Sequence, residues 1–256
     1  MIRIRNLTKC FGDLKAVDDL TLDIAPGELF AFLGPNAAGK TTTIKLLAGL
    51  LRPTSGVCYI GGHDVQREPE AAKRLLAYVP DFPFLYEKLT SAEFMRFIGE
   101  MFEVERSEIA TRTGALFERF GLDPYRHELT ENLSHGTRQL LVIASALLHN
   151  PKVLIIDEPM VGLDPMHARI VKDELKERSR AGTTIFLSTH QLGVAEELAD
   201  RIGIIGQGRL IALGTLDELR RQTSGANALE SIFLSLIEGD AEAALQAGAG
   251  TPSQEP

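Results

Sequence analysis

The chain has 256 residues, of which 44% are hydrophobic and 24% are charged, a composition typical of an ordinary globular protein. Its formal net charge of −8 argues against a general nucleic-acid binder, because such proteins usually carry a basic surface. The N-terminus lacks the apolar core of a secretory signal, and no run approaches the roughly 18 apolar residues of a membrane span. We therefore expect any action at a membrane to go through a partner.

The first part of the chain alternates between strand patterns and turns. Residues 2–4 and 20–24 alternate apolar and polar side chains and predict strands, and Pro26-Gly27 forms a turn after the second. Residues 29–33 are all apolar and predict a buried strand, whereas residues 42–51 carry apolar side chains at helical spacing. The segment between them is therefore the loop of a strand–loop–helix unit.

That connection, GPNAAGKTT, meets the phosphate-binding pattern G-x-x-x-x-G-K-T. In such a loop backbone N–H groups converge at a helix N-terminus, where the helix dipole also favours negative charge. We expect Lys40 to contact the β and γ phosphates and the Thr41 hydroxyl to bind Mg²⁺. The sequence therefore predicts that the chain binds a nucleoside triphosphate. The residues expected to hold it are Gly34, Pro35, Asn36, Ala37, Ala38, Gly39, Lys40, Thr41 and Thr42.

The middle of the chain changes character after a strand predicted at residues 57–60. Residues 84–150 are mostly helical in pattern, and Thr90 with Glu93 fits a capping box at the start of one helix. Residues 121–124, GLDP, interrupt the helical pattern. We therefore expect an inserted α-helical subdomain at about residues 84–150.

Strand patterns return after this insert, at residues 153–156, 184–187 and 202–205, with helical segments between them. Strands that alternate with helices predict an α/β fold with a largely parallel sheet.

The C-terminal part of the chain differs in composition from the rest. Residues 229–237 gather their apolar side chains on one helix face. Residues 239–256 have the small and polar composition of a flexible tail. We expect one domain over residues 1–222, followed by a C-terminal helix and tail over residues 223–256.

Acidic and polar residues end two of the predicted strands. Asp157 follows a buried strand that would bring it beside the phosphate-binding loop, where its carboxylate can hold Mg²⁺ through water. The next residue, Glu158, points elsewhere and could polarise an attacking water as a general base. Residues 188–190, Ser-Thr-His, end a second strand at the sheet edge where α/β folds bind ligands. His190 is therefore a further candidate site residue.

The segment LSHGTRQ, residues 133–139, precedes another helical run. Ser134 is a candidate N-cap and Gly136 permits close approach of a backbone, which makes a second possible anion-binding helix start. Alone, this pattern would indicate ordinary helix capping.

Taken together, these motifs occur in the order and approximate spacing of an ATP-binding cassette ATPase. The phosphate-binding loop is followed by LSHGTRQ, the strand ending in Asp-Glu, GLDP at residues 162–165 and Ser-Thr-His. The chain resembles the ATPase subunit of an ABC transporter over residues 1–222, and LESIFLSLIEG at residues 229–239 resembles exporter-type, drug- or antibiotic-efflux-like subunits. The resemblance implies a P-loop NTPase-type α/β fold, with an N-terminal antiparallel β part and an inserted α-helical subdomain.

The resemblance also implies roles for individual residues. Phe11 stands where the family places an aromatic residue that stacks on adenine. Glu158 would be the catalytic base, His190 would contact the γ-phosphate, and Lys40 would complete the catalytic set. The substrate and metal implied are ATP and Mg²⁺, with Asp157 holding the metal through water.

Two ATPase subunits are implied, as a homodimer or a heterodimer, facing each other head to tail. Ser134 and Gly136 would contact the γ-phosphate bound to the other subunit, and Asp164 would link the two sites. The remaining partner implied is an integral membrane permease, which would place the chain in the cytoplasm on the inner face of the cell membrane.

The sequence departs from the family pattern at several positions. Ala37 replaces the usual Gly, which matters if that position needs a positive φ. His135 and Thr137 replace the usual Gly and Gln, either as a pH-responsive change at His135 or as tolerated surface variants. Asp81 replaces a Gln that contacts Mg²⁺ and the interface with the membrane subunit. We expect Asp81 to keep the metal contact, the alternative being a simple turn residue.

Two alternatives remain at this point. A soluble cassette ATPase acting on nucleic acid or the ribosome would need a long coiled coil or a second cassette, and the chain is short and acidic. A nucleotide-binding regulator without hydrolysis would not need Asp157, Glu158 and His190 together. We therefore predict an ATP-hydrolysing transporter subunit that does not bind nucleic acid.

Overall fold

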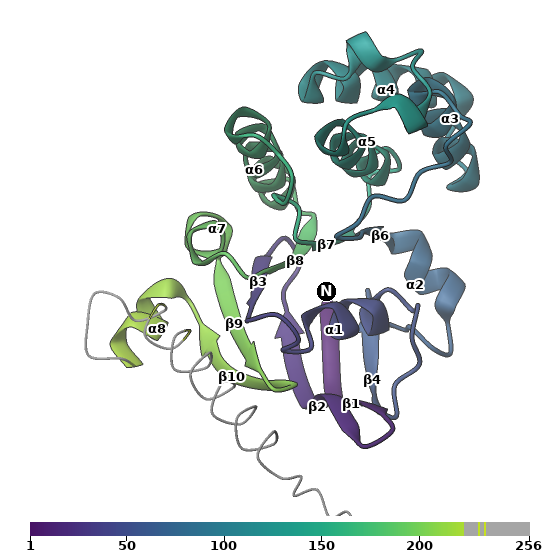
Figure 1. The fold of residues 1–256 in the computed structure, drawn as a ribbon. Coiled ribbons are helices and arrows are strands. Elements are labelled where there is room, and N and C mark those ends of the chain that lie inside the picture. The colour runs from purple at the N-terminus through teal and green to yellow at the C-terminus, as the bar shows by residue number, and fades with distance from the viewer. Residues whose placement is uncertain (223–229, 231–232, 234–256) are drawn as a thin grey trace, which may run out of the picture.

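The N-terminal strands form an antiparallel sheet. The computed structural model describes residues 1–222, 230 and 233, and Figure 1 shows two sheets with helices around them. The smaller sheet has the strand order β2-β1-β4-β5. Its strands are β1 (Ile2–Phe11), β2 (Leu14–Ile24), β4 (Ser55–Ile60) and β5 (His63–Asp64). Because apolar and polar residues alternate along β1 and β2, one face of this sheet is buried and the other faces solvent.

The larger sheet is mainly parallel and has the strand order β10-β9-β3-β8-β7-β6, with only β10 antiparallel to its neighbour. It consists of β3 (Leu29–Leu33), β6 (Leu76–Val79), β7 (Val153–Asp157), β8 (Thr184–Thr189), β9 (Arg201–Gly206) and β10 (Arg209–Gly214). The strands β3, β7 and β8 are buried along their whole length, as their continuous apolar runs require. The α/β fold with a parallel sheet and an antiparallel N-terminal part is confirmed.

The register of the central strands brings the predicted motifs to one edge. Leu33 at the end of β3 pairs with Thr189 at the end of β8, and Asp157 at the end of β7 pairs with Ser188. Because these strands are parallel, the loops that follow them emerge side by side.

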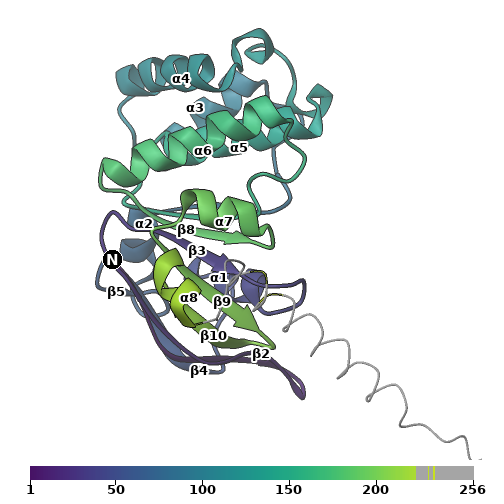
Figure 2. The same ribbon diagram turned by 90° about the vertical axis from the view of Figure 1, so that its left-hand side faces the viewer.

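Helices cover both faces of the larger sheet. Helix α1 lies between the two sheets, in contact with β2, β4, β7 and β8, whereas α6 and α7 pack on β3 and β8 from the other face. Figures 1 and 2 show α3 and α4 grouped away from both sheets, and α5 packs between these two helices and β6. The helices are α1 (Lys40–Leu47), α2 (Pro69–Leu75), α3 (Ser91–Met101), α4 (Arg106–Phe120), α5 (His135–Leu147), α6 (Pro165–Arg180), α7 (Leu192–Leu198) and α8 (Leu216–Gln222).

The helical group begins and breaks where the local sequence requires it. Thr90 and Glu93 form the capping box at the start of α3, each side chain bonding the backbone N–H of the other residue. Gly121 ends α4 in the left-handed conformation, with φ 67°. Short 3-10 helices at Asp123–Tyr125 and Thr130–Asn132 lead from there to α5.

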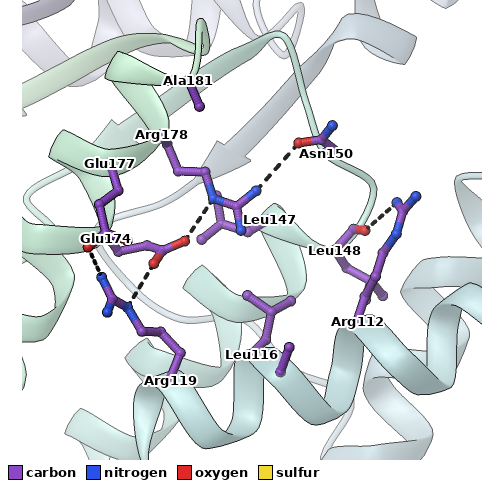
Figure 3. Close-up of a pocket in the computed structure, with 11 residues that line it drawn as sticks. Arg112, Leu116, Arg119, Leu147, Leu148, Asn150, Glu174, Glu177, Arg178 and Ala181 are labelled. Atoms are coloured by element: carbon purple, nitrogen blue, oxygen red, sulfur yellow. Dashed lines mark hydrogen bonds and ion pairs between the residues drawn. The ribbon is translucent and has the colours of Figure 1, made fainter.

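An ion-pair network joins the helical group to α6 (Figure 3). The carboxylate of Glu174 on α6 is buried, and its two oxygens accept from Nε of Arg119 on α4 at 2.9 Å and from Nε of Arg178 at 2.7 Å. Arg119 also pairs with Glu177 at 2.8 Å. Arg119 and Arg178 line one cavity between α4, α5 and α6, and both guanidinium groups already have acidic partners. We therefore read this cavity as a structural contact between the helical subdomain and α6.

A second contact of the helical group, beside another cavity, contains a histidine whose charge state depends on folding. The ring of His149, just after α5, stacks on Phe102 with centroids 3.7 Å apart and planes 6° apart. Burial lowers the pKa of His149 from 6.5 to about 4, with a smaller contribution from the charge of Arg112.

This pKa predicts acid sensitivity. The unfolded chain gains a proton on His149 below about pH 6.5 and the folded chain only near pH 4, so acid favours unfolding within that window. We expect this residue to lower the free energy of unfolding by roughly 1–3 kcal/mol as the pH falls through it. Urea unfolding of wild type and His149→Gln between pH 7 and pH 4 measures the difference. If the free energy of unfolding falls equally with pH in the two proteins, the assignment to His149 is wrong.

Some predicted elements differ from the structure. Helix α1 runs from Lys40 to Leu47 and ends before the predicted Leu51, because Gly49 turns the chain at φ 68°. The predicted helix at residues 229–237 and the tail beyond it lie outside the described residues, apart from positions 230 and 233. In the part of the chain that is described, no helix is long and apolar enough to cross a bilayer.

Candidate active site

The loop between β3 and α1 has a conformation that depends on its glycines. Gly39, the N-cap of α1, has φ 105°, and a methyl group there would lie 2.3 Å from the carbonyl oxygen of Ala16. At Gly34 a methyl group would lie 2.4 Å from the carbonyl oxygen of Ile205. Because backbone atoms cannot yield at such distances, only glycine fits at either position.

Ala37 lies in the same loop and has φ 65°. The position usually occupied by Gly is therefore in the left-handed conformation here, which the sequence had left open. A β-carbon in this conformation costs roughly 1–2 kcal/mol, and the surrounding loop holds it there.

The first turn of α1 is open to an anion. No side chain caps its N-terminus, so its first N–H groups have no side-chain acceptor. The side chain of Lys40 is buried, and its Nζ donates to the carbonyl oxygens of Gly34 at 2.7 Å and Pro35 at 2.9 Å. Burial lowers the pKa of Lys40, while the charges of Glu158 and Asp157 oppose this. Uncapped N–H groups beside a desolvated ammonium fit a phosphate chain.

Asp157 ends β7 beside this helix and is fully buried. Its carboxylate accepts from the hydroxyl of Thr41 at 3.0 Å and from that of Ser188 at 2.5 Å. Burial raises the pKa of Asp157, the two hydroxyl donors lower it, and the charges of Asp81 and Glu158 add to the rise. A divalent cation would relieve this accumulation of negative charge.

The metal-binding potential of this site comes from few protein ligands. Within the described residues, no three His, Cys, Asp or Glu side chains are grouped so that they could hold a metal ion. Mg²⁺ commonly takes one or two carboxylates and completes its shell with phosphate oxygens and water. Thr41, Asp81 and Asp157 fit that pattern.

Glu158 directly follows Asp157, and its side chain contacts residues at the end of β8. It has φ 47°, its Oε1 lies 2.8 Å from Nδ1 of His190, and its Oε2 accepts from the hydroxyl of Thr189 at 3.3 Å. Lys40 Nζ lies 3.9 Å from the same Oε1. The backbone of Glu158 is in the left-handed region, which non-glycine residues seldom adopt, and the contact with His190 orients its carboxylate.

Lys40, Thr41, Asp157 and Glu158 line one cavity of about 680 Å³. Phe11 stands at its rim with 49% of its surface exposed, and Nζ of Lys9 lies over the ring, 5.0 Å from the centroid. An exposed aromatic face beside a phosphate-binding loop can stack on a nucleobase. The lining residues are Phe11, Leu14, Lys15, Ala16, Asn36, Ala37, Gly39, Lys40, Thr41, Thr42, Asp81, Asp157, Glu158, Gln207 and Gly208.

Seven of the predicted site residues do not line this cavity. Gly34, Pro35 and His190 contact residues that do, and Ala38 is buried within the phosphate-binding loop. The other three lie at the starts of two later helices. Ser134 is the N-cap of α5 and accepts from the backbone N–H of Thr137 at 3.2 Å, while Gly136 lies in the first turn of that helix. Asp164 caps α6, where the backbone N–H and the ring of His167 lower its pKa. None of these three residues reaches the cavity of its own chain.

Sequence reasoning placed Ser188 at the ligand-binding edge without giving it a role, and it missed the turn at Gln207 and Gly208. Ser188 bonds Asp157, and Gln207 with Gly208 forms the turn between β9 and β10 that packs against the phosphate-binding loop. The signal available was Gly206-Gln207-Gly208 followed by an alternating strand, which is a hairpin pattern.

The fold and the site define a P-loop nucleoside triphosphatase with an inserted helical subdomain. The family profile described as ABC transporter matches residues 17–161. The chain belongs to this family, and it is the ATP-binding and ATP-hydrolysing subunit of an ABC transporter. Subunits of this family act with membrane permeases and form dimers.

Relatives and solved structures agree with this assignment. The chain is 38% identical to the daunorubicin/doxorubicin resistance ATP-binding protein of Streptomyces peucetius over 89% of this chain and 69% of that protein. It is also 38% identical to a Nod factor export ATP-binding protein of Cupriavidus metallidurans over 90% and 76% of the respective chains. A structure of the ATP-binding subunit of an ABC transporter superposes with a TM-score of 0.87, at 34% identity, over 93% of this chain and 99% of that one.

A second solved structure bears on the reaction. A dimeric ATP-binding cassette in a post-hydrolysis state, bound to ADP and Pi, matches with a TM-score of 0.77 and 25% identity, over 84% of this chain and 99% of that one. The chain is therefore an ATPase, and the alternative of an ATPase acting on nucleic acid or the ribosome is not supported.

Proposed function

We propose that this chain powers export of a drug- or antibiotic-like molecule through a separate membrane permease, from the cytoplasmic face of the cell membrane. The supporting relatives are named for resistance to daunorubicin and doxorubicin and for Nod factor export. The observation that carries the catalytic part is the meeting of Lys40, Asp157 and Glu158 in one cavity.

Each residue has a role in this proposal. Phe11 stacks on the adenine, and the loop from Gly34 to Thr42 binds the phosphate chain of ATP through its N–H groups and Lys40. Thr41, Asp157 and Asp81 would hold Mg²⁺, and the metal would neutralise charge on the phosphate oxygens. Glu158 accepts a proton from the attacking water at its carboxylate, and His190 keeps that carboxylate in place at 2.8 Å while reaching the γ-phosphate.

The second half of each site comes from another subunit, the same chain or a different one. Ser134 and Gly136 lie outside the cavity at an exposed helix start, which suits a contact with nucleotide bound elsewhere. Asp164 joins the two halves. A head-to-tail pair buries both nucleotides, and closure of the pair precedes cleavage.

This chain has an exposed aromatic segment beside Asp81 on which the permease can dock. The aromatic side chains of Phe82 and Phe84 are 74% and 77% exposed, and Tyr86 continues the same segment. A second apolar cavity, of about 280 Å³, is lined by the exposed side chains of Leu50 and Met101. We propose that a cytoplasmic segment of the permease covers this exposed apolar surface, because such patches mark interaction sites.

The test of this function is affinity purification of the tagged chain from native membranes, followed by ATPase assay. We expect a multi-span membrane protein to accompany the chain and to change its ATPase rate. Recovery of ribosomes or DNA instead would reject the transporter role.

Asp81 provides a prediction about the metal site and the docking surface together. Asp81→Gln restores the usual family residue and should keep the ATPase activity of the isolated subunit. Asp81→Ala loses an oxygen ligand, so half-maximal activity should need more Mg²⁺, about 2- to 10-fold. Transport in reconstituted vesicles should fall further than ATPase activity does.

The measurement is a Mg²⁺ titration of the ATPase rate for wild type and both variants, with transport assayed in parallel. In the structure the carboxylate of Asp81 accepts a hydrogen bond from the N–H of Phe82 at 2.9 Å. Because an ordinary turn residue makes the same bond, the titration is needed to decide between the two roles. If Asp81→Ala matches wild type in both assays, Asp81 is only a turn residue.

A further inference from the structure

The imidazole of His135 packs on a loop of its own chain. His135 is the first residue of α5, and Gly162 lies in the loop between β7 and α6. A methyl group on Gly162 would lie 2.3 Å from Cδ2 and 2.7 Å from Nε2 of His135. The ring therefore occupies the space that a side chain at position 162 would need.

Two further contacts surround this one. The ring centroid of Phe82 lies 6.1 Å from that of His135, with the planes inclined by 49°. A methyl group on Gly136 would lie 3.0 Å from the carbonyl oxygen of Gly162. The start of α5 thus touches the Gly162 loop through two successive residues, and His135 also meets the segment that follows Asp81.

The Gly162 loop is closely tied to Glu158. The N–H of Val161 donates to the carbonyl oxygen of Glu158 at 3.2 Å, and the N–H of Leu163 donates to that of Met160 at 3.3 Å. These bonds fold residues 158–163 into consecutive tight turns. A shift of Gly162 therefore displaces the backbone that positions Glu158, because a tight turn has little freedom to absorb the shift.

The direction of the ring decides between two uses of His135. A histidine that served only to contact a phosphate of the opposite subunit would leave its ring free of its own chain. Here the ring lies against Gly162 and Phe82. The neighbouring residues Ser134 and Gly136 remain available for the opposite subunit. His135 therefore connects the helix start that would contact the opposite subunit with the loop that follows Glu158.

We propose that His135 is a positioning residue that couples the two ATP sites, by holding the Gly162 loop against the start of α5. The inference rests on the proposed head-to-tail pair of subunits. When α5 is drawn onto nucleotide in the opposite site, the imidazole carries that movement to Gly162 and so to Glu158 of its own site. The family's usual glycine at position 135 has no side chain to do this.

The test compares His135→Gly with His135→Phe, which keeps an aromatic ring without a titrating group. Both changes are made in a Glu158→Gln background, and light scattering follows ATP-dependent dimerisation. For His135→Gly we expect the ATP concentration at half-maximal dimerisation to rise about 2- to 30-fold, the range by which residues between coupled sites change coupling. His135→Phe should restore the parent value.

Controls separate coupling from a structural defect. The affinity of the monomer for ADP should be unchanged in His135→Gly, since the nucleotide cavity does not include His135. The melting temperature should fall only slightly, since His135 is exposed at a helix start. Equal half-maximal concentrations for His135→Gly and its parent, or failure of His135→Phe to restore the parent value, would overturn the inference. A parallel loss of ADP affinity and thermal stability would do the same. If the Glu158→Gln parent itself does not dimerise with ATP, the proposed pair of subunits is wrong and the inference fails with it.

Discussion

Replacing Glu158 by Gln should slow ATP hydrolysis by about 10²- to 10⁴-fold, the usual contribution of a general base. The amide of Gln has nearly the same shape, so the contacts of position 158 with His190 and Thr189 can persist. What is lost is the ability of the side chain to accept a proton from water. Binding of ATP should therefore survive while cleavage fails.

The same variant should accumulate an ATP-bound dimer, because closure of the pair precedes cleavage in the proposed cycle. Gel filtration with and without ATP measures the dimer, and phosphate release measures the rate. Glu118→Gln, at an exposed position on α4, is the matched control and should behave as wild type. Normal hydrolysis by Glu158→Gln would remove Glu158 from the role of base.

Replacing Lys40 by Met should weaken nucleotide binding by about 10- to 150-fold, from the roughly 1.5–3 kcal/mol of hydrogen bonds to a charged group. Met keeps most of the buried stem of the side chain and removes only the ammonium group. Because burial of that group lowers its pKa, its charge is costly in the protein alone and is best compensated by phosphate oxygens.

A second lysine of the cavity offers the control for this prediction. Lys15 also lines the cavity, but its side chain is 58% exposed and pairs with Asp18 at 3.3 Å. Lys15→Met should change affinity far less, since an exposed charge is screened by water. Equilibrium dialysis with ATP compares both variants with wild type. Equal effects of the two changes would show that Lys40 acts only through the general charge of the cavity.

Local sequence was sufficient for much of the fold. The continuous apolar run of β3, the capping box at Thr90 and Glu93 and the break at Gly121 each depend on residues adjacent in the chain. The phosphate-binding loop belongs to the same class, because its glycines meet backbone constraints that any chain with this pattern shares. The α/β class followed from the alternation of such elements.

Elements with weak local signals were missed. Strand β6 (Leu76–Val79) is short and directly follows α2, so its apolar residues continue the helical pattern without a turn signal. Strand β10 alternates but has two exposed and three half-buried residues, and its only strong cue is the preceding Gly206-Gln207-Gly208 turn. Pairing with a neighbouring strand, rather than propensity, decides both.

The sequence by itself indicated the phosphate-binding loop, because the spacing of Gly34, Gly39 and Lys40 is a local pattern, and it indicated Asp157 and Glu158 because two acids follow a continuous apolar strand. The tertiary structure alone decided how they meet. Parallel pairing of β7 with β8 brings Ser188 to Asp157 and His190 to Glu158, and close packing brings the imidazole of His135 onto Gly162. These contacts join residues far apart in the chain, and no local pattern encodes them because they depend on sheet register and helix packing.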